Sequence, residues 1–313
     1  MTSTYFITGE WGTTFMRLHL CRRDSGLLNI VASISNNNGV VGCTNFEDVF
    51  FDTAQPWLNE HGSMPVVLAG MIAANIGWHD SGYAACPVSS SDLRPLTFTT
   101  RGIRITLAPG LSCRNMFGLP DVVRGEDMQI FGWLDSHPRR PDEQHILCLP
   151  GRHVKWVLTR GHAVQSFFTG MNGELEDILI QHSLLGRGVP KTKTLNQPEF
   201  EAGRQLMFND PTLSMGHALF ATRSRLVLGE HTPETAASFL SGVLIGSDIR
   251  DAMHAFGSRH LLNGPVQVFG ENDLSRTYVQ SMQSMGRAAQ CITEPDLAVQ
   301  GLSRTLSNTF KSL

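Results

Sequence analysis

The residues of this chain that could do chemistry begin with a polar turn near the N-terminus, formed by Glu10, Gly12, Thr13 and Thr14. Apolar runs flank the turn on both sides, so it is expected to join two strands. A glycine lets backbone N–H groups approach an anion closely, two hydroxyls add donors, and Glu10 offers a carboxylate to a metal ion. The turn therefore indicates phosphate chemistry, with an ordinary polar hairpin as the alternative.

A second group combines a cation with two adjacent acids. Glu126 and Asp127 follow Arg124 and open a stretch in which apolar residues recur at helical spacing. In the first turn of a helix the positive end of the dipole favours the charged form of an acid. Capping explains Asp127 equally well, whereas Arg124 directly before the helix favours a functional role for Glu126.

Two further residues follow a predicted buried strand at residues 66–68. Asn75 and Trp78 come after the small-residue turn that ends this strand, and ligands of open α/β sheets bind just beyond such strand ends. Both residues are therefore candidates to face a cleft. For Trp78, simple packing is the alternative.

The second half of the chain repeats the opening order of strand, glycine turn, strand, turn and strand. A buried strand at residues 146–149 leads into the turn that contains Gly151 and Arg152, and two strands follow. Near the C-terminus, Gly270 and Asn272 lie between a strand and a helix, with Asn272 as the expected N-cap. This last turn is a candidate shelf for a nucleotide base.

The intervening segments are expected to position these turns. Residues 46–61 predict an amphipathic helix, residues 87–100 a loop, and residues 233–253 a helix whose small residues Gly242 and Gly246 allow close packing. His182 lies on the apolar face of another predicted helix and is expected to be a core histidine.

Composition excludes several classes of function. The chain has 313 residues and a net charge of −3, with Lys and Arg scattered, so neither a nucleic acid nor a membrane is an expected partner. No apolar run is long enough to span a bilayer, and no leader segment is recognisable. The six cysteines form no zinc-type pairs, which predicts reduced thiols in a cytoplasmic protein.

Taken in order, these motifs resemble the 2-dehydro-3-deoxygalactonokinase family, whose members have the sugar-kinase, Hsp70 and actin fold. The resemblance spans nearly the whole chain. It is carried by Glu10-Trp11-Gly12-Thr13-Thr14-Phe15-Met16-Arg17, Ala69-Gly70-Met71, Asn75-Ile76-Gly77-Trp78, Val123-Arg124-Gly125-Glu126-Asp127-Met128-Gln129, Pro150-Gly151-Arg152-His153-Val154-Lys155-Trp156, Asn172-Gly173-Glu174-Leu175 and the segment from Phe239 to Gly246. Three positions depart from the family pattern: Glu10 replaces Asp, Arg152 replaces a hydroxyl residue, and Glu271-Asn272 follows Gly270 in place of Thr.

The resemblance implies an enzyme that uses ATP and Mg²⁺ to phosphorylate the terminal hydroxyl of 2-dehydro-3-deoxy-D-galactonate, giving the 6-phosphate in galactonate degradation. Glu10 would hold the metal, and Glu126 would orient or deprotonate the hydroxyl, with Asp127 in reserve. The other implied contacts are nucleotide binding by Gly12, Thr13, Thr14, Gly151, Arg152, Gly270 and Asn272, and substrate binding by Arg124, Asn75, Trp78 and Lys155.

The implied fold is α/β, with two ribonuclease-H-like lobes, mixed sheets flanked by helices, and an interlobe cleft. Residues 1–107 would form the N-terminal lobe with the first phosphate turn and part of the sugar site. Residues 108–313 would form the C-terminal lobe with the second phosphate turn and the base site, and the last helix is a candidate to return to the first lobe. A homodimer stays open. The alternatives are a degenerate, non-catalytic sugar-acid binding protein and a kinase for another 2-keto-3-deoxy sugar acid.

Overall fold

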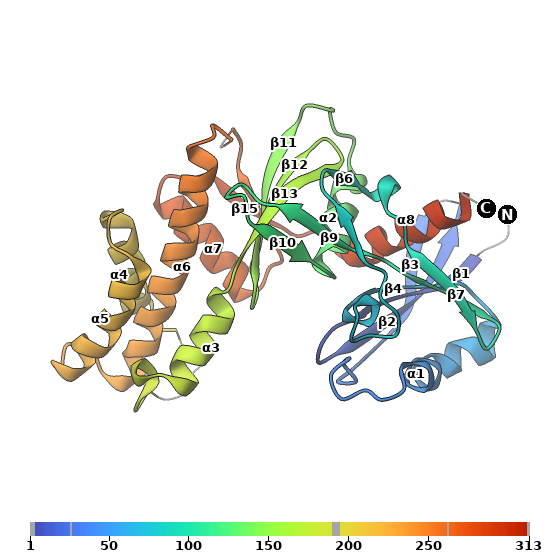
Figure 1. The fold of residues 1–313 in the computed structure, drawn as a ribbon, viewed down its shortest axis with the longest axis horizontal. Helices are drawn as coiled ribbons and strands as arrows, with labels where there is room; N and C mark the ends of the chain where they lie inside the picture. Colours follow the sequence, from blue (N-terminus) through green and yellow to red (C-terminus); the bar gives the residue numbers. More distant parts are fainter. Residues whose placement is uncertain (1–3, 26, 190–194, 262, 312–313) are drawn as a thin grey trace. The chain divides into compact units, whose positions relative to one another are not determined.

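A computed structural model of the chain describes residues 4–25, 27–189, 195–261 and 263–311 (Figure 1). The chain divides into two compact units. Unit 1 contains Met1–Glu143, Thr159–Ser166 and Glu294–Leu313, and unit 2 contains Gln144–Leu158 and Phe167–Thr293. Three separated stretches of sequence therefore build unit 1.

The main sheet of unit 1 has the strand order β3-β2-β1-β4-β8-β7. The first three strands form an antiparallel meander, β4 is parallel to β1 and β8, and β7 is antiparallel to β8. A parallel pair needs a crossover connection, and helix α1 provides one between β3 and β4. The bounds are β1 Thr4–Trp11, β2 Met16–Asp24, β3 Leu27–Asn36, β4 Val66–Gly70, β7 Leu96–Thr100, β8 Ile103–Leu107 and α1 Phe46–His61.

The two faces of this sheet carry different helices. Side chains alternate between faces along a strand, and Ile7 and Trp11 of β1 pack in one apolar core with Phe50 and Trp57 of α1. The intervening side chains of β1 lie on the other face, and helix α8 (Leu297–Lys311) packs on β1, β4 and helix α2 (Glu126–Ser136). Glu10 is one of these intervening residues.

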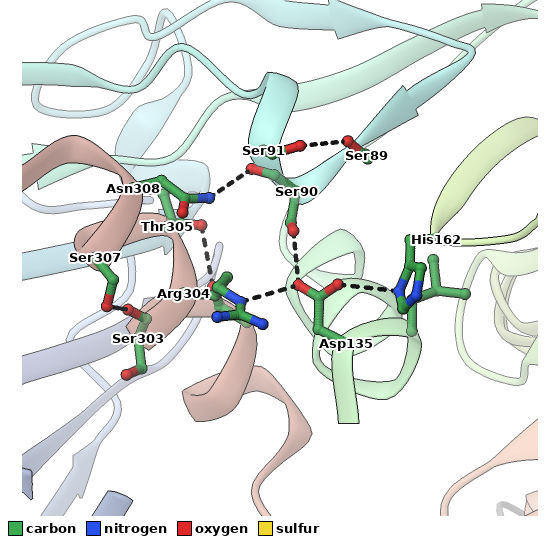
Figure 2. A network of polar contacts seen from close by, with 12 residues as sticks. Ser89, Ser90, Ser91, Asp135, His162, Ser303, Arg304, Thr305, Ser307 and Asn308 are labelled. Carbon is green, nitrogen blue, oxygen red and sulfur yellow. Dashed lines mark hydrogen bonds and ion pairs between the residues drawn. The ribbon is translucent and has the colours of Figure 1, made fainter. Parts of the chain in front are cut away.

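Helices α2 and α8 approach each other unusually closely. A Cβ atom on Gly132 would lie 2.0 Å from the carbonyl oxygen of Leu297, and one on Gly301 would lie 2.1 Å from that of Met128. Polar contacts beside this crossing connect both helices to the 3₁₀ turn Ser90–Asp92 (Figure 2). The contacts are Ser90 Oγ to Asp135 at 2.6 Å, Arg304 Nε to Asp135 at 3.6 Å and Asn308 Nδ2 to the Ser90 carbonyl at 3.2 Å.

The sheet of unit 2 has the corresponding order β15-β14-β11-β12-β13, with β14 parallel to β11 and β15. A short strand, β6 (Val88–Ser89), pairs with the first residues of β13, and these paired residues belong to unit 1. The bounds in and around this sheet are β11 Gln144–Leu149, β12 Val154–Arg160, β13 Ala163–Gly170, β14 Val266–Phe269, β15 Ala289–Ile292, α3 Asn172–His182, 3₁₀ turn Leu184–Gly186, α4 Gln197–Asn209, α5 Met215–Val227, α6 Pro233–Gly257 and α7 Asp273–Ser284. The shared strand order confirms the predicted α/β fold of two ribonuclease-H-like halves with mixed sheets flanked by helices.

Small residues let α4 and α6 pack closely, as the sequence predicts. A Cβ atom on Gly203 would lie 2.2 Å from the Phe239 carbonyl oxygen, and one on Gly242 would lie 2.0 Å from that of Phe200. Side chains at these two positions would separate the helices. Gly246 lies in the same contact, 3.1 Å from the Arg204 Cα by the same measure.

Three details differ from expectation. Residues 96–100 form strand β7 in a stretch predicted to be loop, because three threonines and Phe98 favour a strand and the segment pairs with β8. Strands β5 (Tyr83–Ala85), β9 (Gly110–Arg114) and β10 (Pro120–Val123) form a separate small sheet. His182 is exposed, so the prediction of a core histidine is wrong.

No helix in the described ranges combines the length and apolarity needed to cross a membrane.

Candidate active site

The carboxyl ends of β1 and β4 meet the start of α2 in unit 1. Trp11 pairs in register with Gly70, which has φ +96° and whose Cβ would lie 2.7 Å from the Trp11 carbonyl oxygen. Gly125, with φ +104°, is the N-cap residue of α2, and a Cβ atom on it would lie 3.6 Å from the Cα of Gly70. Glycine is required at both positions because the backbone is left-handed there and the segments nearly touch. This approach brings Glu10 and Glu126 to one place.

Glu10 is a largely desolvated carboxylate whose side chain is 17% exposed. Its register partner on β2 is Arg17, with Nη1 3.9 Å from Oε2. Burial raises the pKa of Glu10, Arg17 lowers it, the Glu126 carboxylate raises it, and a hydrogen bond from Gln129 lowers it. Two mutually repelling acids beside a threonine turn suit a divalent cation, since Mg²⁺ is commonly bound by one or two carboxylates together with substrate phosphates.

Asp127, the residue after Glu126 in α2, is buried. Its Oδ1 accepts a hydrogen bond from the Gly125 amide at 2.6 Å, while Oδ2 has no partner among the described residues. Burial, reinforced by the Glu126 charge, raises the pKa of Asp127 to about 7. Its visible contact is therefore with the turn that starts α2, in keeping with the capping alternative.

The first polar turn is held from behind by the loop after β3. The Gly12 amide donates to the Phe15 carbonyl at 2.9 Å, and the amides of Val40 and Val41 donate to the carbonyls of Gly12 and Thr13, each at 3.0 Å. Both threonines of the turn are exposed. The backbone is thus fixed while the hydroxyls face outwards, as an anion-binding turn requires.

Arg124 orders the segment after β4. Its guanidinium, 5% exposed, donates to the carbonyls of Ala73 and Gly82 and to Ser81 Oγ, and it stacks 4.3 Å from the centre of the Tyr83 ring. These contacts fix the chain on both sides of Asn75 and Trp78. Arg124, which was predicted to bind the substrate, therefore also has a structural role.

Of the two other residues predicted in unit 1, one is exposed and one is packed. Asn75 is exposed. Trp78 is half-buried, with its ring centre 5.3 Å from that of Phe98 and 6.0 Å from that of Phe50. Packing therefore accounts for most of the Trp78 side chain, as its alternative interpretation predicted.

The second turn, between β11 and β12, lies in unit 2. The space at the Cβ position of Gly151 is open, and Arg152 is 62% exposed, with Nη2 3.8 Å from Glu174 and 4.0 Å from Asp177. His153 Nε2 lies 2.6 Å from the Glu174 carboxylate, and this contact, followed by the neighbouring charges, lowers the pKa of Glu174. The ion pairs of the Arg152 side chain are thus long ones, at the upper end of the range for such contacts.

Three other predicted site residues, Lys155, Gly270 and Asn272, belong to unit 2. Lys155 is buried within β12, one residue before Trp156. Gly270 has φ +90°, and Asn272 caps α7, its side chain accepting from the Ser275 amide at 2.9 Å. The predicted N-cap is therefore confirmed.

The structure brings Glu10, Glu126 and Asp127 together next to the first turn, and it adds two residues that had received no role. Arg17 and Gln129 both contact Glu10. Each carried a signal in the sequence: Arg17 ends the first motif, and Gln129 follows Glu126 by three residues, which places both on one face of a helix.

Two sheets of matching strand order, with a threonine turn beside paired acids at the end of the first strand, are the arrangement of the sugar-kinase, Hsp70 and actin fold. The sequence matches the 2-keto-3-deoxy-galactonokinase family over residues 10–305, and the chain belongs to that family.

Named relatives agree with this assignment. The chain is 31% identical over 288 residues to 2-dehydro-3-deoxygalactonokinase of Escherichia coli, covering 91% of both chains. It is 28% identical over 315 residues to a probable 2-dehydro-3-deoxygalactonokinase of Rhizobium meliloti, covering 96% of both. A crystal structure of a Sinorhizobium meliloti protein assigned as a 2-dehydro-3-deoxygalactonokinase superposes with a TM-score of 0.84 at 26% identity, covering 98% of this chain and 99% of the other.

Proposed function

We propose that the chain transfers the γ-phosphoryl group of ATP to the terminal hydroxyl of 2-dehydro-3-deoxy-D-galactonate, giving the 6-phosphate. The observation that carries this proposal is the convergence of Glu10 and Glu126 at the ends of β1 and β4, beside an outward-facing threonine turn. Phosphoryl transfer depends chiefly on positioning and on stabilisation of charge. A second acid near a metal-binding acid supplies a group that can accept the proton of the attacking hydroxyl.

Glu126 is the proposed base, because it begins α2 and remains partly exposed, whereas Asp127 is buried. Asp127 would support Glu126 by holding the turn at Gly125. Arg124 would act on the sugar acid through the segment that carries Asn75 and Trp78. Its Nε has no hydrogen-bond partner among the described residues, so the guanidinium keeps a donor that a substrate carboxylate could use.

The remaining residues are assigned to the nucleotide and to the metal. Glu10 would hold Mg²⁺, which when bound neutralises charge on the phosphates. In unit 2, Lys155 is assigned to the substrate. The proposed phosphate and adenosine contacts are Gly12, Thr13, Thr14, Gly151, Arg152, Gly270 and Asn272.

A coupled assay of ADP release over a panel of 2-keto-3-deoxy sugar acids tests the proposal. We expect saturable turnover that depends on Mg²⁺ and is highest with the galactonate derivative. Turnover that is highest with another member of the panel would keep the kinase and change the substrate. If there is no turnover, no thermal shift with Mg·ATP and a clear shift with a sugar acid, the chain is a non-catalytic binding protein.

A further inference from the structure

A buried acid lies at the centre of unit 2, outside the residues considered so far. Asp248, in α6, accepts hydrogen bonds from Trp156 Nε1 at 3.0 Å and from the Tyr278 hydroxyl at 2.9 Å. Burial raises the pKa of Asp248 to about 6, while these two donors lower it. A buried carboxylate is costly unless it is hydrogen-bonded, and here the donors come from β12 and α7. One side chain thus connects three elements.

The same carboxylate reaches the start of α3. A Cβ atom on Gly170, at the end of β13, would lie 2.5 Å from Asp248 Oδ1 and 3.6 Å from Asn172 Nδ2. The absence of a side chain at Gly170 therefore makes room for the acid and the amide side by side. Asn172 is the first residue of α3, and its amide also lowers the pKa of Asp248.

The start of α3 in turn supports the turn between β11 and β12. A Cβ atom on Gly173 would lie 2.8 Å from the Arg152 Cα and 2.9 Å from the Gly151 carbonyl oxygen, so backbone packs directly on backbone. The Glu174 amide donates to the Arg152 carbonyl at 3.1 Å, and the Glu174 carboxylate contacts His153. Asp248 therefore holds this turn through Trp156, on the strand that leaves it. Its Oδ1 also lies beside Asn172 at the floor of the turn, where Asn172 Nδ2 has no hydrogen-bond partner among the described residues.

We propose that Asp248 is a positioning residue that fixes the backbone of residues 150–153 for contact with the nucleotide phosphates. The inference rests on the proposed function. Displacements of about 1 Å at reacting groups cost on the order of 100-fold in rate. Loss of the carboxylate is therefore expected to act on nucleotide use more than on sugar-acid use. The sugar-side residues of unit 1 keep their contacts, and Lys155 stays within β12, which is paired with β11 and β13.

The test compares Asp248→Asn with Asp251→Asn, which changes an exposed acid one turn later on the same helix. Both donors bond to the same oxygen, Oδ2. An amide in place of the carboxylate therefore either turns its N–H groups toward the two donors and loses both hydrogen bonds, or keeps them and turns its N–H groups toward the Asn172 amide beside Gly170. We expect the KM for ATP to rise about 10-fold or more, with the KM for the sugar acid within twofold of wild type and Asp251→Asn unchanged. Assays are run well below each variant's Tm.

An equal change in both KM values, or no change in either, would overturn the inference. If Asp248→Asn does not fold, Tyr278→Phe provides the test, because it removes a single donor and leaves the acid in place. The same comparison is made, the change in the KM for ATP against the change in the KM for the sugar acid. A smaller rise, about threefold, confined to ATP is expected for that variant. A wild-type protein without turnover would instead refute the proposed function, so the two failures are distinguishable.

Discussion

Glu10 and Glu126 approach each other at a cost to the stability of the protein without ligands. Burial is the largest influence on the Glu10 carboxylate and Glu126 adds repulsion, so its pKa is raised despite the nearby Arg17. A raised pKa means that ionised Glu10 destabilises the folded state above its ordinary titration range. Sites that bind cations commonly carry such a cost, which the bound ion removes.

The first prediction concerns Glu10→Gln, which removes this charge. The variant should be more stable than wild type at pH 7, while turnover should require a higher Mg²⁺ concentration. Urea unfolding and a magnesium titration of activity measure the two effects. Glu60→Gln, at an exposed position in α1, is the control. Unchanged magnesium dependence would remove Glu10 from the metal site.

The second prediction concerns Glu126→Gln. If Glu126 accepts the proton of the attacking hydroxyl, turnover should fall by about 10²–10⁴-fold, while the thermal shift produced by Mg·ATP should stay close to that of wild type. Stopped-assay ADP formation and scanning fluorimetry measure these effects. Turnover within threefold of wild type would assign the role to another group.

The third prediction concerns pH and Asp127. Its pKa is raised from an ordinary 3.8 to about 7, so the folded state binds more protons than the unfolded state between these values. This contribution to stability is present below about pH 4 and is lost as the pH rises to 7. In Asp127→Asn the fall in unfolding free energy from pH 4 to pH 7 should be smaller than in wild type, by on the order of 2–4 kcal/mol.

Urea unfolding at each pH measures the Asp127 effect, with the exposed Asp52→Asn as the matched control. Other acids titrate in both proteins, so only the difference between the two curves carries information. Parallel curves for wild type and Asp127→Asn would mean that the buried acid is not preferentially protonated in the fold.

At the scale of elements, the crossing of α2 and α8 depends on two glycines. In a helix, Gly→Ala normally stabilises by up to about 1 kcal/mol, but here the new methyl group would meet backbone at 2.0 Å in Gly132→Ala and at 2.1 Å in Gly301→Ala. Backbone cannot move aside as a flexible side chain does. The fourth prediction is therefore that each variant loses about 2–3 kcal/mol in unfolding free energy.

The matched control for the glycine variants is Gly264→Ala, where the Cβ position is open and the backbone is not left-handed. Denaturant unfolding of the three variants compares them directly. Equal stabilities would show that the helices separate at little cost. The prediction also bears on activity, because α2 presents Glu126 from its first residue.

The elements also show what sequence reasoning can reach. Local signals predicted α1, the cap of α7 and the close packing of α6, since caps, apolar spacing and small residues act over a few positions. Strand β5 depends on pairing with β9, a distant segment that no local pattern specifies. Strand β7 forms a tight hairpin with β8, and its threonines and Phe98 were a local strand signal. His182 was misassigned because the apolar stripe of α3 remains incompletely buried.

The candidate site divides in the same way. The motifs predicted Glu10 and Glu126 as chemistry-bearing residues, but their proximity depends on a close approach of two left-handed glycines, Gly70 and Gly125. Likewise, the sequence predicted a substrate-binding cation at Arg124, but it did not show that the guanidinium donates hydrogen bonds to backbone carbonyls. The types of the site residues were predictable from the sequence, whereas the protein groups that contact their side chains were not.

At the scale of the whole molecule, unit 1 is not continuous in sequence, because its last segment follows unit 2 in the chain. Unit 1 takes its last helix, α8, from the end of the sequence, after all of unit 2 has been made. The apolar side chains of α8 that are buried against β1, β4 and α2 are Leu297, Val299, Leu302 and Leu306. At roughly 1.5–3 kcal/mol each, their burial contributes on the order of 6–12 kcal/mol.

That contribution is comparable to the entire stability of a typical domain, about 5–15 kcal/mol. The fifth prediction is that a chain truncated after residue 293 loses the fold of unit 1 while unit 2 persists. Limited proteolysis with mass spectrometry should show early cleavage in the described part of residues 4–143 and protection of residues 167–189, 195–261 and 263–293. A synthetic peptide of residues 294–313, added in trans, should restore protection of unit 1. If the truncated chain resists protease as the full chain does, the sheet and α1 alone hold unit 1 together, and α8 is dispensable for it.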